Sequence, residues 1–146
     1  MRNLLVFFHL AAAIFWMGGM AFMVLALRPS LAVLEPPQRL VLLQRTLARF
    51  FVVVGVSIFV LLGTGGALFA GTGGQVPPGW NAMAALGVLM MLVFGHIIAA
   101  PYRRFRAAVA GADWADAGRR ANQVAASVKL NLGLGWIAIA AVLLWR

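Results

Sequence analysis

Four long apolar runs dominate the pattern of hydrophobic and polar positions, and the segments between them carry most of the charge. The runs cover residues 4–27, 50–70, 81–100 and 124–145. A run of about 18 or more apolar residues is long enough to cross a bilayer as a helix. The pattern therefore predicts an all-α fold, an integral membrane antiparallel four-helix bundle that forms a single domain over residues 1–146.

The stretches between the runs predict where the helices end. The second run is followed by GTGGQVPPG, a turn-forming stretch, and the third is followed by Pro101. Ahead of the second run, Leu40, Leu43 and Leu47 recur at helical spacing. We expect this segment, which begins at Pro36, to be an amphipathic helix that lies on the membrane surface.

The start of the fourth helix carries its own signals. Asp113 is a candidate N-cap, and Asp116 and Arg120 are spaced as an i,i+4 ion pair. We therefore expect the fourth helix to start in the cytosol and to run unbroken into the membrane.

The first run predicts a retained helix and not a cleaved signal peptide. It exceeds the apolar core of about 7–15 residues that signal peptides have. Arg28 and Pro29 follow it, where a signal peptide has small residues at its cleavage site.

Composition supports a membrane location, because 64% of the residues are hydrophobic and only 10% are charged. Soluble domains are about 45–50% apolar and about 25% charged. We therefore expect the lipid bilayer to solvate the chain. The absence of cysteine excludes disulfides, thiolate metal sites and cysteine nucleophiles.

The charge pattern predicts the orientation of the bundle. The chain has twelve basic and three acidic residues. Most of the basic residues lie between runs one and two and between runs three and four. The positive-inside rule places both of these segments in the cytoplasm. Both termini and the uncharged 71–80 loop then face the periplasm of a bacterial inner membrane. Topology and anionic lipid explain the basic residues, so we expect no nucleic acid partner.

His9 and His96 are the only two histidines, and each lies inside an apolar run. An ionisable group in the bilayer is costly, which makes a ligand or proton-handling role the first hypothesis. The alternative for each is a neutral imidazole that hydrogen-bonds a serine, a carbonyl or a water. Their depths differ by roughly 15 Å at about 1.5 Å per residue, so they cannot ligate one metal ion together.

Methionines are the candidate partners of these histidines. Met17, Met20 and Met23 lie on the first run, and Met83, Met90 and Met91 lie on the third. Thioether sulfur favours Cu(I), and imidazole suits copper or haem iron. Met83 matches the depth of His9 and Met20 that of His96, so the sulfurs could form a relay. Methionine as filler of an apolar core is the alternative reading.

Other positions add weaker expectations. His9, Trp16 and Met23 recur every seven residues, so they share one face of the first helix. Arg28 and Lys129 either snorkel to the interface or serve as counter-charges for an anion or a haem propionate. The sequence contains no phosphate-binding glycine loop, zinc-protease motif or catalytic triad.

The stretch HLAAAIFWMGGM resembles the first helix of the copper-resistance D (CopD) family and of the related HemJ-type protoporphyrinogen oxidases. Gly79-Trp80 and the GHIIAAPYRRF stretch around His96 resemble their third helix. The CopD resemblance implies copper handling, with His9 and methionines as ligands. The HemJ resemblance implies haem b, with His9 as an axial ligand. HemJ proteins carry a lysine shortly after the Gly-Trp pair, whereas residues 81–85 here contain none.

The leading prediction is therefore a CopD-like protein, a carrier rather than an enzyme, that binds or translocates copper. His9 with Met83 forms its outer site, Met17, Met90 and Met91 its relay, and Met20 with His96 its inner site. The first alternative is a haem b protein of electron transfer or porphyrin oxidation. The second is a non-catalytic membrane subunit. A periplasmic copper protein or another membrane subunit is the expected partner.

Overall fold

The computed structural model describes residues 1–145, and helices make up every regular element in that range. The elements are α1 (Arg2–Phe22), η1 (Met23–Leu27), α2 (Arg28–Ser30), η2 (Leu31–Val33), α3 (Pro36–Ala70), α4 (Pro78–Ile97), η3 (Ile98–Tyr102), α5 (Arg103–Ala110) and α6 (Trp114–Leu144). They join into four rods of 31 to 35 residues, each long and apolar enough to cross a membrane. The all-α prediction with four spans is confirmed.

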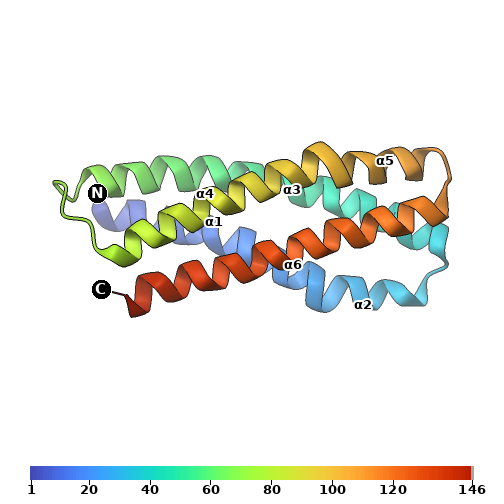
Figure 1. The fold of residues 1–146 in the computed structure, drawn as a ribbon, viewed down its shortest axis with the longest axis horizontal. Helices are drawn as coiled ribbons and strands as arrows, with labels where there is room; N and C mark the ends of the chain where they lie inside the picture. Colours follow the sequence, from blue (N-terminus) through green and yellow to red (C-terminus); the bar gives the residue numbers. More distant parts are fainter. Residues whose placement is uncertain (146) are drawn as a thin grey trace.

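The four rods lie side by side, and both termini are at the same end of the molecule (Figure 1). α1 packs chiefly against α3, and α4 packs chiefly against α6. The bundle therefore consists of two closely packed helix pairs that meet more loosely along their length.

The interior of the bundle is built from apolar and aromatic side chains. The ring of Phe51 packs edge-on against Phe94 at 5.4 Å between centroids and against Tyr102 at 4.8 Å. The outer surface is apolar as well, since Leu25 is 74% exposed and Phe59 is 79% exposed. A helix pairs its backbone polar groups within itself, which is what a lipid environment requires of a spanning segment. The fold is that of a multi-pass membrane protein.

The expectation that the segment before the second run lies on the membrane surface is wrong. It is the first part of α3, continuous with the span. Leu40, Leu43, Leu47 and Phe51 are all buried in the bundle. The amphipathic pattern is real, but its apolar face packs against protein instead of lipid, because the other rods extend equally far at this end.

Pro101 does not end the third helix. It is buried inside the π-helical segment η3, and the rod continues through α5 to Ala110. A proline ring clashes with the carbonyl four residues earlier in a regular α-helix. The wider π turn makes room for the ring. The π-helical segment η1 likewise directly precedes Arg28 and Pro29.

The expected N-cap and ion pair at the start of the fourth helix, and its unbroken course, are confirmed. The carboxylate of Asp113 accepts a hydrogen bond from the backbone N–H of Asp116 at 3.0 Å and caps α6. Asp116 in turn pairs with Arg119 at 3.0 Å and with Arg120 at 3.4 Å. α6 runs unbroken from Trp114 to Leu144.

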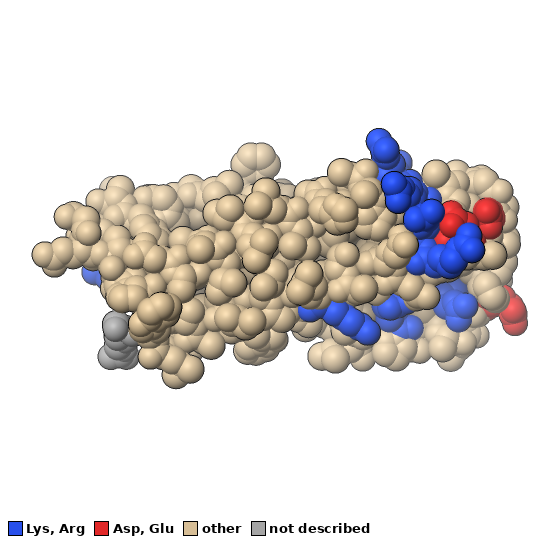
Figure 2. Space-filling view, viewed as in Figure 1, with Lys and Arg blue, Asp and Glu red and all other residues tan. Residues whose placement is uncertain are grey.

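Lysine and arginine side chains gather at the end of the bundle opposite the termini (Figure 2). This end holds α2, α5, the start of α3 and the start of α6 (Figure 1). The clustering agrees with the charge asymmetry between the connecting segments of the sequence.

Candidate functional site

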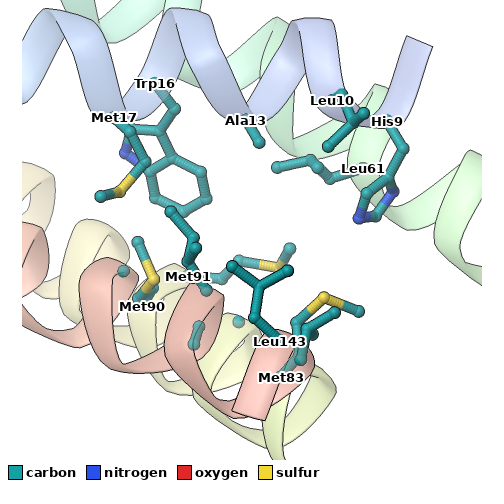
Figure 3. A pocket seen from close by; sticks show the side chains of 15 residues that line it. His9, Leu10, Ala13, Trp16, Met17, Leu61, Met83, Met90, Met91 and Leu143 are labelled. Carbon is teal, nitrogen blue, oxygen red and sulfur yellow. The ribbon is translucent and has the colours of Figure 1, made fainter. Parts of the chain in front are cut away.

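A cavity of about 400 Å³ lies between α1 and the pair formed by α4 and α6 (Figure 3). Its walls are almost wholly apolar, and we call it the His9 cavity. The residues that give it chemical character are His9, Trp16, Met17, Met83, Met90 and Met91. A volume of this size falls in the range of small-molecule and cofactor sites, about 300–1,000 Å³.

The hydrogen bond made by His9 determines which ring nitrogen is free. Nδ1 of His9 lies 2.9 Å from Oγ1 of Thr64. The Thr64 hydroxyl lies 2.6 Å from the carbonyl of Val60, to which it donates its single hydrogen. With this donation Thr64 accepts from His9, and on this basis we assign the ring proton to Nδ1. The lone pair of Nε2 is left available as a ligand.

The ring of His9 rests on α3 at a glycine. A Cβ atom added at Gly65 would lie 3.3 Å from Cε1 and 3.7 Å from Nδ1 of His9. Gly65 thus allows the imidazole to approach the α3 backbone beside Thr64. These two adjacent residues of α3 fix the position of the ring, which is half-buried.

The methionines of the His9 cavity come from two helices. Met17 projects from α1, and Met83, Met90 and Met91 project from α4. Figure 3 shows Met83 opposite His9 at one end of the cavity and Met17 opposite Met90 at the other, with Met91 between them. The structure therefore gathers around one space the residues that we assigned to the outer site and the relay.

Two further features hold this arrangement in place. Trp16 is buried and packs edge-on against Phe94, with 6.3 Å between the ring centroids. Gly135 of α6 lies directly against the thioether of Met17, so a larger residue there would displace the sulfur.

Met20 and Met23 lie apart from the His9 cavity. Both are buried in the core, and Met20 is only 2% exposed. Met23 lines a separate small pocket of about 20 Å³ with Arg28. Their surroundings are those of core side chains.

His96 lies on the exposed side of α4, whereas Met20 is enclosed in the core. The structure therefore does not bring His96 and Met20 together as the inner site that we expected. Their positions in the sequence predict the same depth in the membrane, but depth does not report which face of a helix a side chain occupies.

Arg28 and Lys129 line a different pocket, near the charged end of the bundle. That pocket and the His9 cavity share no residue. Neither cation is therefore placed to balance a charge on a group bound in the His9 cavity.

Sequence reasoning missed Thr64 and gave no role to Asn131. Asn131 is 1% exposed and donates from Nδ2 to the backbone carbonyl of Met90 at 3.2 Å. It ties α6 to α4 beside two of the cavity methionines. A hydroxyl or an amide within an apolar run is the signal that could have drawn attention to either position.

The donor set of the His9 cavity is one imidazole nitrogen and several thioethers, which are borderline-to-soft ligands. Within residues 1–145, no three His, Cys, Asp or Glu side chains gather into a group that could hold a metal ion. The cavity therefore lacks the carboxylate oxygens that hard cations such as Ca²⁺ and Mg²⁺ prefer as ligands. In comparisons with known proteins, the chain matches no family model, no curated protein and no solved structure.

Proposed function

We propose that this protein binds Cu(I) in the His9 cavity and passes it along the bundle, in the manner of the CopD-like proteins it resembles. The observation that carries the proposal is the imidazole of His9, which Thr64 holds beside a cavity lined by four methionines. The resemblance of the first helix to CopD supports the same metal.

The ligand chemistry favours copper over other ions. Thioether sulfur selects Cu(I) among the common metals, and imidazole nitrogen also binds it well. Apolar walls suit a monovalent ion that binds without a shell of ordered water. Zinc prefers thiolates, imidazoles and carboxylates, and among these the cavity offers only His9.

Movement of the ion follows from the arrangement of the sulfurs. His9 with Met83 forms the acceptor site, and Met91 leads from it toward Met17 and Met90. Each thioether is a weak ligand, so the ion passes by ligand exchange from one to the next. The proposal stops at Met17 and Met90, because His96 and Met20 face different environments.

A haem b protein is the second candidate, favoured by the cavity volume of about 400 Å³, which is far more than one ion needs. His9 and a methionine could serve as axial ligands. The propionates, however, find no cation on the cavity wall, because Arg28 and Lys129 line another pocket. The residues present fit this group poorly, and we derive no chemistry through it.

The same proposal places the protein in the bacterial inner membrane with both termini in the periplasm. The clustering of basic side chains at the end opposite the termini supports this orientation. The His9 end then opens toward the periplasm, where a soluble copper protein could deliver the ion. A purely structural subunit is the remaining alternative.

Copper affinity of the detergent-purified chain tests the proposal. We expect His9→Ala and Met83→Leu each to weaken Cu(I) binding by at least about 10–100-fold, the loss typical when even an outer-shell partner is removed. Competition with a chromophoric Cu(I) chelator measures the affinity. Met20→Leu and His96→Ala are matched controls, because neither side chain lines the cavity.

Three outcomes would contradict the copper proposal or favour one of its alternatives. If His9→Ala binds Cu(I) as tightly as the wild-type chain, the copper proposal is wrong. A Soret band in the purified protein that disappears in His9→Ala would establish the haem alternative. A chain that binds neither copper nor haem would leave the structural subunit.

A further inference from the structure

A second pocket of about 460 Å³ lies near the charged end, between the end of the first rod, the start of α3 and the first half of α6. Arg28, Arg39 and Lys129 line it from the three rods, and Asn122 adds an amide. We call it the basic pocket. It has no part in the proposed copper path.

Within residues 1–145, no ion pair engages the cations of the basic pocket. The closest side-chain contact of Arg28 is neutral, a hydrogen bond from its guanidinium to Oδ1 of Asn122 at 2.7 Å. Arg28 and Arg39 are close enough to repel one another. The chain has three carboxylate side chains, Glu35, Asp113 and Asp116, and none of them lines the pocket.

Asp116 is also engaged elsewhere, with Arg119 and Arg120. Three cations that converge on one concave space without a counter-charge form a site for an anion. Guanidinium groups bind phosphate oxygens through paired N–H donors, and a lysine adds a point charge.

The rest of the lining is apolar and points to the source of the phosphate. Val24, Leu31, Leu40 and Leu43 form the remaining wall, next to the cations. Leu25, one helical turn before Pro29, is 74% exposed, and Leu130, next to Lys129, is 57% exposed. These exposed leucines directly follow Val24 and Lys129, two residues of the pocket wall, so apolar side chains that could contact acyl chains adjoin the pocket in the sequence.

We propose that the basic pocket binds the phosphate headgroup of an anionic phospholipid, whose acyl chains follow the exposed apolar side chains of η1 and α6. Basic pockets between membrane helices on the cytoplasmic side are suited to such headgroups. Gly118 leaves room for the headgroup, since a Cβ added there meets nothing within 4 Å.

Native mass spectrometry of the full-length chain with added phosphatidylglycerol tests this inference, with phosphatidylcholine of the same acyl chains as comparison. We expect phosphatidylglycerol to be retained preferentially. Arg28→Gln combined with Lys129→Gln should weaken its retention by about 25-fold, since each cation contributes about fivefold. Arg103→Gln combined with Arg104→Gln removes the same charge from exposed positions of α5 and should change retention little.

A second variant tests the inference even if the Arg28→Gln/Lys129→Gln chain misfolds. Gly118→Asp keeps every cation and introduces a carboxylate into the pocket, so it should lower phosphatidylglycerol retention, whereas Gly118→Ala should not. Equal losses in the Arg28/Lys129 and Arg103/Arg104 variants would overturn the inference in favour of general surface attraction. Equal retention of both lipids, or displacement of phosphatidylglycerol by millimolar inorganic phosphate, would also overturn it. No variant touches the His9 cavity, so failure of the copper proposal is detected separately.

Discussion

Thr64 holds the ring of His9, because its hydroxyl hydrogen-bonds Nδ1 and leaves Nε2 free of this contact. Partners that hold a ligating histidine in one tautomer are as much part of a metal site as the ligand itself. Under the copper proposal, Thr64 would be such a partner for His9, although 55 positions separate the two residues in the sequence.

Thr64→Val keeps the shape of the side chain and removes the hydroxyl, so it tests this contact directly. We expect Cu(I) affinity to fall by about 10–100-fold, because the ring loses its fixed tautomer and orientation. Chelator competition measures the change. Thr46→Val removes a hydroxyl that bonds the Leu42 carbonyl far from the cavity, and it should leave affinity unchanged. Equal affinities in Thr64→Val and wild type would remove Thr64 from the site.

At this scale the sequence predicts residue types and depths but not pairings. The seven-residue spacing placed His9 and Trp16 on one face of the first helix, and both line the cavity. The partnership of His9 with Thr64 depends on how α1 is rotated and shifted against α3, which no pattern within either run encodes. Whether these residues bind a metal stays a prediction.

Among the helices, the close approach between the start of α4 and the end of α6 requires a glycine. The backbone N–H of Gly79 donates to the carbonyl of Trp145 at 3.0 Å. A Cβ at this position would collide with the backbone carbonyls of Ala141 and Trp145. Backbone atoms cannot move aside as a flexible side chain can, so the two helices would have to separate here.

Gly79→Ala is therefore expected to destabilise the protein by about 1–3 kcal/mol, the usual cost of overpacking. Gly95→Ala, on the same helix but with nothing within 4 Å of its Cβ, should be neutral or stabilising by up to about 1 kcal/mol. Thermal unfolding in one detergent compares the two variants. A Gly79→Ala chain as stable as Gly95→Ala would contradict the close approach.

The apolar runs predicted the elements, but not their full lengths. Each helix extends beyond its run at the charged end, because arginines, prolines and alanines there continue the helix without being apolar enough to extend a span. Pro101 misled the sequence analysis, since a proline in a regular α-helix breaks it, whereas a π-helical turn accommodates the ring. Periodicity of 3.6 residues cannot reveal such a local change of winding.

For the molecule as a whole, the lack of cysteine makes orientation directly measurable. We expect Gln75→Cys, in the loop between α3 and α4, to react with a membrane-impermeant maleimide added outside intact cells with a permeable outer membrane. Glu35→Cys, just before α3, should react only after the inner membrane is opened. Both residues are exposed, so reactivity reports location. The reverse labelling pattern would invert the proposed topology.

The overall architecture was the most predictable feature, since lipid solvation allows few arrangements for four apolar helices. The order of packing was not predictable. α1 pairs chiefly with α3 and α4 with α6, and the His9 cavity lies where the two pairs meet. The apolar faces of all four runs are similar in composition, so they do not specify which neighbours pack most closely.

The uneven distribution of charge along the rods also sets the height at which the protein sits in a bilayer. Rods of 31 to 35 residues are about 46–52 Å long, which exceeds a hydrocarbon layer of about 30 Å. The excess helix length must project from the bilayer at the arginine-rich end, because moving arginine side chains into the hydrocarbon layer is costly. The opposite tips are then held nearly flush with the other interface. His9, seven residues into the first rod, ends up about 10 Å beneath that boundary, shielded from bulk water.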